Sequence, residues 1–419
     1  MSTMKVTDAA VLGMQAKLRD AWTPAMYAAL QNGMEEKCGN AWPKWAEQPI
    51  FMPPTLREKI TGAAMSIAND LKALDIPARR IDAVPESFQT LLPANPLPKT
   101  LLIDFAVVEN PETKNLDVKL IELQGAANYF FQTQAQAQTW VELLKGVPGI
   151  PQAWEWTLNG SNHEGFTALM RDCILGTHRP EECAMVDVDL ESQHFHTDFV
   201  ATARALGIPV IDAEDLIQIN DKLYRRPTEL GGALIEIKRL YNRVIGDEVA
   251  SKKIVLPFDF TTLDIEMFPN PADQYRWAKG VMVYLKDHPS VPKTTVLSEV
   301  PADVLSGDLS GFVLKRAEGF GGNAVITDIT LDSLSGIPEA ERNQWLMQEK
   351  VKYAHWVTPC GEDPRPIGTE VRVVMVRRDE DTEMTPAYLW VRASRGKMFN
   401  AGFNKTETGV GVTLGMWPK

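Results

Sequence analysis

Residues 100–124 read TLLIDFAVVENPETKNLDVKLIELQ, and this stretch decides the fold of the chain. An apolar run over 100–108 is followed by a turn-forming stretch, 109–115, and by a second apolar run over 116–123. Two such runs separated by Asn and Pro are typical of a β-hairpin. We therefore predict two antiparallel strands joined by this turn.

Three oxygen-bearing side chains fall on one face of the predicted hairpin. Folding about position 113 places Asp104 opposite Glu122, and Gln124 shares the face of Glu122 because residues two apart point the same way. Two facing carboxylates repel unless a cation lies between them, and carboxylate and amide oxygens suit magnesium. The pattern predicts a magnesium site. The alternative is a solvent-facing polar stripe, although the apolar residues occupy one face only.

A lysine followed by glycines predicts a phosphate-binding loop. Lys315 lies in an apolar strand, and Gly319, Gly321 and Gly322 follow it within a strand-loop-strand pattern. Glycines allow backbone N–H groups to wrap around a phosphate, and the lysine supplies a positive charge. The alternative is a glycine-rich turn beside an exposed lysine. The spacing is not that of a Walker loop.

An amide and an acid further along the chain could contact an adenine ring. We expect a helix that ends at residues 345–349, so that Gln348 and Glu349 lie at the edge of an apolar run. Their side-chain and backbone groups would face the polar edge of adenine. A solvated strand edge is the alternative interpretation.

The remaining pattern predicts a mixed α/β (α+β) protein. Between residues 165 and 260, strands at 182–189 and 207–212 flank a helix at 196–206, which is typical of a parallel sheet. A helix over 234–249 would close this unit. The predicted regions are 1–95, mostly helical; 96–145, hairpin and helix; 165–260, βαβ unit; and 261–419, the remainder, with strands at 370–377 and 387–394.

Composition excludes several classes of function. The 419 residues carry a formal charge of −12, which argues against nucleic acid as a partner but leaves room for a small anionic ligand. No apolar run reaches the roughly 18 residues of a membrane span, and no secretory signal precedes the first helix, so we expect a cytoplasmic protein. Four widely spaced cysteines without a CxxC pair argue for reduced thiols rather than zinc.

Together these pieces resemble the circularly permuted ATP-grasp family, which includes the synthetase domain of glutathionylspermidine synthase. That family has a metal hairpin with an aspartate on one strand and Glu-x-Asn on the next. It later has a lysine in a helix and a second lysine in a strand before a mobile glycine loop. This chain has Asp104, then Glu122 with Gln124, then Lys279 and, 36 residues on, Lys315.

Further positions support or depart from the resemblance. A late arginine contacts phosphate in the family, and Arg392 is the best match here, with Arg372 second. The segment 241–243 also resembles related members. Gln124 stands where the family usually has Asn, and Leu102 stands where related synthases place an arginine two residues before the aspartate.

The resemblance implies a circularly permuted ATP-grasp core with a Rossmann-like unit and a helical N-terminal region. It also implies an ATP- and magnesium-dependent ligase that joins a small-molecule carboxylate to an amine through an acyl phosphate, without a covalent protein nucleophile. The implied residues are Lys315 and Arg392 for catalysis; Lys279, Lys315, Gly319, Gly321, Gly322, Gln348, Glu349 and Arg392 for ATP; and Asp104, Glu122 and Gln124 for Mg²⁺.

Two alternatives remain open at this point. One is a non-catalytic or degenerate nucleotide-binding protein, which Leu102 favours. The other is an ATP-dependent phosphotransferase built on the same core. Residues 400–408 and the N-terminal helices are candidates for the acceptor pocket, but nothing in them names a substrate, and the oligomeric state is not readable from the sequence.

Overall fold

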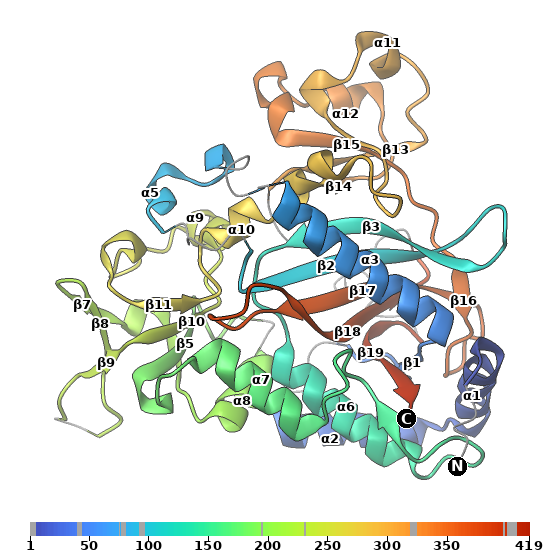
Figure 1. Ribbon diagram of the computed structural model, residues 1–419, viewed down its shortest axis with the longest axis horizontal. Helices are drawn as coiled ribbons and strands as arrows, with labels where there is room; N and C mark the ends of the chain where they lie inside the picture. Colours follow the sequence, from blue (N-terminus) through green and yellow to red (C-terminus); the bar gives the residue numbers. More distant parts are fainter. Residues whose placement is uncertain are drawn as a thin grey trace.

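The structure, a computed structural model, describes residues 6–39, 44–74, 76, 81–91, 97–193, 196–229, 232–318, 325–396, 399 and 409–419. Within these ranges no helix is both long enough and apolar enough to cross a bilayer. The elements form a mixed α/β molecule with one large sheet and several smaller ones (Figure 1). The α/β class expected from the sequence is confirmed at that level.

The predicted hairpin is present. Strands β2 (Thr100–Glu109) and β3 (Leu116–Gln124) pair antiparallel, with Asp104 opposite Glu122 as expected. The register shifts between Asp104 and Phe105, so a bulge lies directly beside this pair. Bulges re-aim neighbouring side chains and are frequent next to functional sites.

The hairpin belongs to the largest sheet of the described residues, which has eight strands. Its main order is β1-β19-β18-β17-β2-β3, with β16 added beside β17 and β4 beside β19. The strands expected over 370–377 and 387–394 are confirmed as β17 and β18. The other bounds are β1 Ile50–Phe51, β4 Trp154–Glu155, β16 His355–Val357, β17 Ile367–Val376, β18 Thr385–Ser394 and β19 Gly411–Pro418.

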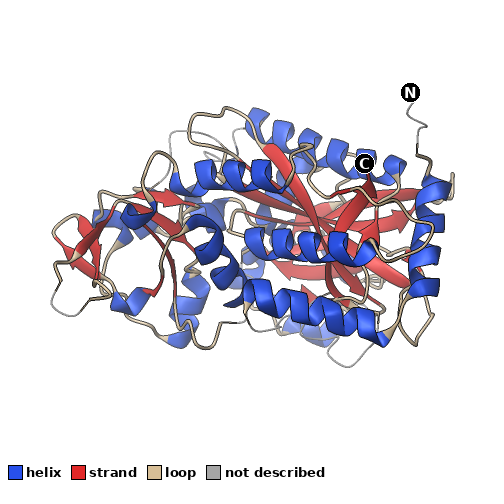
Figure 2. Cartoon of the chain, turned by 90° about the horizontal axis from the view of Figure 1, so that it is seen from below, coloured by secondary structure: helices blue, strands red, loops and turns tan. Residues whose placement is uncertain are grey.

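Helices cover both faces of this sheet (Figures 1 and 2). On one face, Ile60 of α3 shares a core cluster with Ile103 of β2. On the other, Trp140 of α6 shares a cluster with Leu102 of the same strand. Successive residues of β2 therefore face different helices, as the pleat of a strand requires. The helix bounds are α1 Asp8–Ala21, α2 Pro24–Cys38, α3 Pro54–Ala73, α6 Phe130–Leu144 and α7 His163–Leu175.

The N-terminal helices start where the sequence supplies caps. Thr7 and Thr23 precede α1 and α2, and each side-chain oxygen accepts a hydrogen bond from a backbone N–H three residues later, at 3.3 Å in both cases. Such caps satisfy donors that the first helical turn leaves free. The mostly helical character expected for the first 95 residues is confirmed for α1, α2 and α3.

A second sheet holds the predicted βαβ unit. Strand β5 is followed by α8 and by β6, which pairs with β5 in parallel. The helix predicted over 234–249 is wrong, because strands β9 and β10 occupy its first half and a helix starts only at Gly246. The alternating and aromatic residues of this stretch suit a buried strand. The bounds are β5 Cys183–Asp187, α8 His196–Leu206, β6 Val210–Asp212, β9 Ile235–Ile237, β10 Arg239–Asn242, α9 Gly246–Lys252 and β11 Glu266–Phe268.

A small antiparallel sheet forms a lobe beside β3 (Figure 1). Its order is β12-β15-β13-β14. The helix expected to end at residues 345–349 is wrong: these residues form β15, held between β12 and β13, because the ladder satisfies their backbone groups on both sides. The bounds are β12 Thr294–Val296, β13 Phe312–Arg316, β14 Val325–Ile326 and β15 Trp345–Glu349.

Gly125 joins the hairpin to the segment that leads to the lobe. Its N–H donates to the carbonyl oxygen of Trp277 at 2.7 Å. A Cβ at Gly125 would lie 2.5 Å from the backbone oxygen of Asp273, closer than side chains approach. The glycine therefore permits the close approach that places Lys279, at the start of the 3-10 helix η5 (Lys279–Leu285), beside the hairpin.

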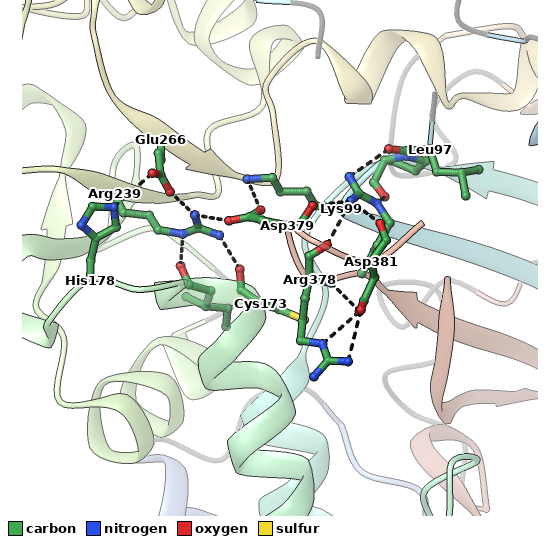
Figure 3. A network of polar contacts seen from close by, with 12 residues as sticks. Leu97, Lys99, Cys173, His178, Arg239, Glu266, Arg378, Asp379 and Asp381 are labelled. Atoms are coloured by element: carbon green, nitrogen blue, oxygen red, sulfur yellow. Dashed lines mark hydrogen bonds and ion pairs between the residues drawn. The ribbon is translucent and has the colours of Figure 1, made fainter. Parts of the chain in front are cut away.

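A cluster of ion pairs around one buried arginine ties the second sheet to the large one (Figure 3). We call Arg239, Glu266, Asp379 and Lys99 the clamp. The Arg239 side chain is 0 % exposed; it pairs with Glu266 and with Asp379 at 2.7 Å. It also donates to two backbone carbonyls in the last turn of α7, at 2.8 Å each. A cation there complements the helix dipole.

Candidate functional site

The side chains predicted to hold a metal lie among cations. Asp104 is 1 % exposed, and its two oxygens accept from Arg372 Nε at 2.6 Å and from Arg372 Nη2 at 2.7 Å. Arg392 Nη2 donates to the same carboxylate at 2.7 Å. Burial pushes the pKa of Asp104 upward, yet the two guanidinium groups hold it below its ordinary value.

Glu122 is neutralised in the same way. Its carboxylate pairs with Lys279 Nζ at 2.8 Å, and the Glu122 side chain is 17 % exposed. Burial raises its pKa, but Lys279 and a hydrogen bond from Gln124 bring the pKa below its usual range. The premise that Asp104 and Glu122 lack a counter-cation without magnesium is therefore wrong. Sequence symmetry reveals the pairing of strands β2 and β3 but not the arginines that β17 and β18 contribute.

Lys315 differs from its neighbours because it has no acid partner. It is 6 % exposed, and its Nζ donates to the carbonyl oxygen of Ile121 at 2.9 Å. Within the described ranges no carboxylate lies at ion-pair distance from it. Burial, together with repulsion from Lys279, lowers the pKa of Lys315 to about 8. A buried ammonium with spare N–H groups is a site for an anion.

The balance of charge points the same way. We call Lys279, Lys315, Arg372, Arg392, Asp104, Glu122 and Glu370 the phosphate cluster. Four cations face three carboxylates, which leaves one positive charge in excess at a pH where all are ionised. Desolvated charge is expensive unless it is compensated. An anionic ligand would supply the compensation.

An aromatic platform supports the two arginines. The guanidinium carbons of Arg372 and Arg392 lie 5.2 and 5.4 Å from the ring centroid of Trp390. Arg372 also donates to Asn128 Oδ1 at 3.2 Å. Cation–π contact and a fixed hydrogen bond restrict both side chains, so their charges are preorganised.

One member of this cluster, Glu370, was not identified from the sequence. Glu370 contacts Arg392 and accepts from Tyr353 Oη at 3.1 Å. Arg372 was only a second choice. The signal for both was the stretch Glu370-Val-Arg372 inside an otherwise apolar strand, since buried charges in a strand core are placed there only with partners.

Gln348 and Glu349 point to opposite faces of β15, as neighbours in a strand do. Gln348 is 2 % exposed and donates to Thr294 Oγ1 at 3.0 Å, whereas Glu349 is exposed. The backbone N–H of Glu349 donates to Lys293 O at 2.9 Å. Only the helix end is therefore wrong, because the segment is a strand; the contact of Gln348 and Glu349 with adenine stays a prediction.

Two expected parts of the site lie outside the described residues. These are Gly319, Gly321 and Gly322 of the predicted phosphate loop, and residues 400–408, named as a candidate acceptor region. The strands that flank the glycines, β13 and β14, pair antiparallel and place Lys315 opposite Val325.

The segment at residues 241–243 connects the phosphate cluster to the second sheet. Arg243 Nη1 pairs with Asp198 at 3.0 Å and donates to the backbone oxygen of Asn128 at 3.0 Å. Asn128 thus accepts from Arg372 through its side chain and from Arg243 through its backbone. The carboxyl end of the parallel sheet therefore lies against the hairpin site.

Comparison with known proteins supports the fold. The sequence matches no family model and no curated protein. Among solved structures, the chain is similar to a glutathione synthetase-like effector from Globodera pallida, solved in its apoform, with a TM-score of 0.52 and 11% identity over 94% of this chain and 96% of that one. The fold of the chain is therefore similar to that of a glutathione synthetase-like protein. At this identity the likeness shows the fold alone.

Proposed function

We propose that the chain is an ATP-dependent ligase that joins a carboxylate to an amine through an acyl phosphate. The observation that carries this proposal is Lys315, a buried lysine without an acid partner in the described ranges, beside Lys279. Its surroundings suit the triphosphate of a nucleotide. The likeness to a glutathione synthetase-like protein supports the same chemistry, and circular permutation of the core is part of the proposal.

Lys279, Lys315 and Arg392 would hold the phosphates in this scheme. Gly319, Gly321 and Gly322 would cover them, and the β15 segment with Gln348 and Glu349 would lie near the adenine. Cations fixed before the substrate binds stabilise charge in the transition state without reorganising. A positioned acceptor then needs no covalent nucleophile on the protein. The cysteines fit this view, because all four are buried and burial raises the thiol pKa of Cys38 and Cys173 to about 12.

The chain's residues fit magnesium in part. Glu122 and Gln124 are adjacent hard oxygen donors next to the excess positive charge. Asp104 has both oxygens occupied by arginines, and among the described residues no group of three or more His, Cys, Asp or Glu side chains is placed to hold a metal. Magnesium bound with ATP would neutralise phosphate charge. Asp104 would join Glu122 and Gln124 as a ligand once Arg392 turns from it to a phosphate oxygen.

A second candidate function is nucleotide binding without ligation. It is favoured by Leu102, which is 1 % exposed and packs with α6 where related synthases place an arginine. It is also favoured by the two-point contact between Asp104 and Arg372. In this case the phosphate cluster would recognise a nucleotide and release no phosphate.

Thermal unfolding tests the nucleotide proposal directly. ATP with magnesium at about 100 times its dissociation constant should stabilise the chain by roughly 2.7 kcal/mol. GTP and EDTA arms measure base preference and metal dependence. The absence of a shift with any purine nucleotide would remove both candidate functions. Phosphate release in the presence of small carboxylates and amines would then separate ligation from simple binding.

A further inference from the structure

A cavity of about 200 Å³ lies beside the clamp, away from the phosphate cluster. Lys99, Asp273 and Arg377 line it together with a set of apolar side chains. The apolar lining residues are Leu91, Leu97, Leu263, Ile265 and Met267. Lys99 is five residues from Asp104 along the chain, about 16 Å at the rise of a strand. The two sites share no lining side chain among the described residues.

The decisive side chain in this cavity is Asp273. It is 1 % exposed, and among the described residues neither carboxylate oxygen has a partner at hydrogen-bond distance, although Arg276 and the Trp277 side chain lie close enough to lower its pKa. Burial raises its pKa to about 6, so the carboxylate is still ionised at neutral pH. An unpaired carboxylate in the interior costs free energy, and such groups usually mark a ligand site or an active site.

Positive charge faces the same cavity without reaching Asp273. Arg377 donates to backbone carbonyls, among them Leu97 O at 3.3 Å, and makes no ion pair among the described residues. Lys99 pairs with Asp379 at 2.7 Å, which leaves further N–H groups of its ammonium unused. The cavity thus holds an acid and two cations on its wall, separated by more than ion-pair distance.

The size of the cavity limits the ligand. At about 30 Å³ per water molecule the space equals several waters, and it is below the roughly 300 Å³ at which pockets for drug-sized molecules begin. A nucleotide is too large for it. The five apolar side chains favour a ligand with a hydrocarbon group. Asp273 favours a positively charged end on the ligand, and Lys99 and Arg377 favour a negatively charged end.

We propose that this cavity binds a small zwitterion, a free α-amino acid with an apolar side chain. Its ammonium would donate to Asp273, its carboxylate would accept from Lys99 and Arg377, and its side chain would pack on Leu263 and Met267. Because charge-assisted contacts of both signs are formed at once, a molecule with only one charged end leaves a buried charge unpaired.

Calorimetric titration of the full chain with L-leucine tests the proposal. Two analogues remove one charge each: 3-methylbutan-1-amine lacks the carboxylate, and 4-methylpentanoate lacks the ammonium. Leucine should bind at least about tenfold more tightly than either analogue, the scale of one lost charged hydrogen bond. Either of two results with the unaltered chain would overturn the assignment: no binding of leucine, or an analogue that binds as tightly as leucine.

Variants locate the site. Asp273→Asn should weaken leucine binding about tenfold or more, and the melting temperature of the ligand-free chain checks its fold, because the change also removes a carboxylate that attracts the buried Arg276. Asp264→Asn is the matched control: it lies in the same segment but is exposed, and should leave both quantities unchanged. Leucine affinity of Asp273→Asn equal to that of the unaltered chain would place the ligand elsewhere. ATP is absent from every arm, so failure here leaves the ligase proposal untouched.

Discussion

The clamp and the phosphate cluster are both groups of charged side chains built around buried arginines, yet their charges balance differently. In the clamp two cations, Arg239 and Lys99, face two carboxylates, and the remaining Arg239 donors go to helix carbonyls. In the phosphate cluster four cations face three carboxylates, and Lys315 has a single carbonyl partner. A network with equal numbers of positive and negative charges stabilises the fold by itself, whereas a network with an excess charge favours binding of a ligand of opposite charge.

The largest expected effect concerns Glu122, the proposed magnesium ligand in the phosphate cluster. Glu122→Gln removes one negative charge at nearly constant shape, so magnesium-dependent turnover should fall by about 1,000-fold while the fold is kept. Phosphate release at saturating magnesium measures turnover, and the circular dichroism spectrum checks the fold. Glu109→Gln, an exposed change at the turn end of the hairpin, should be silent. Near-normal turnover of Glu122→Gln would defeat the metal assignment.

The next effect tests the unmatched lysine itself. Lys315→Ala should lower turnover or ATP affinity by about 100-fold, the scale for loss of one preorganised charge contact. Nucleotide titration and steady-state kinetics measure both quantities. Lys286→Ala, which changes an exposed lysine of the adjoining segment, is the control. Similar losses in the two variants would mean that Lys315 has no special role.

The clamp should respond in stability instead of activity. Arg239→Met leaves two buried helix carbonyls without their donor, while Asp379 keeps Lys99 and Glu266 keeps His178, so it should cost about 2 kcal/mol of unfolding free energy. Urea denaturation measures it. Arg378→Met removes a 40 % exposed arginine paired with Asp381 and should cost no more than about 1 kcal/mol. Equal costs would remove the distinction between a matched interior network and a surface pair.

A pH series sharpens the comparison further. With the pKa of Lys315 lowered to about 8, its proton is present at pH 7 and largely lost at pH 9. ATP affinity should therefore fall about tenfold between these values if the charge is required. The fall should be absent in Lys315→Ala. In the nucleotide-free chain the sign is opposite: the unfolded chain keeps this proton up to its higher ordinary pKa, so Lys315 contributes stability that increases from about pH 8 upward.

The smallest effect concerns the amide. Gln124→Asn retains the oxygen donor on a shorter side chain and restores the residue more usual in the resembled family. The change in turnover should stay below about tenfold, less than the loss of a metal-supporting group. Magnesium titration of the rate measures it. A loss of turnover as large as that of Glu122→Gln would show that the length of the side chain at position 124, rather than the type of donor atom, limits magnesium binding.

Sequence reasoning succeeded where contacts are local. The pairing of Asp104 with Glu122 follows from one turn, and the βαβ unit follows from periodicity over about 30 residues. It failed for 234–249 and for 345–349, where pairing with distant strands overrides local preference. The arginines on Asp104 come from positions 268 and 288 residues away, a separation that no local pattern reports.

The close approach at Gly125 has a consequence for finding relatives by sequence. The N–H of Gly125 donates to Trp277 O, and its Cα packs against the Asp273 backbone. Two short segments that are far apart in the sequence are therefore in contact and constrain each other: Glu122-Leu-Gln-Gly125 and Trp277-Ala-Lys279. Each segment alone is too short to distinguish related chains from unrelated ones. A search profile that scores both segments jointly, with Gly required directly after Gln124, describes a packing constraint rather than general sequence similarity. It should retrieve chains that share this junction even when overall identity is low.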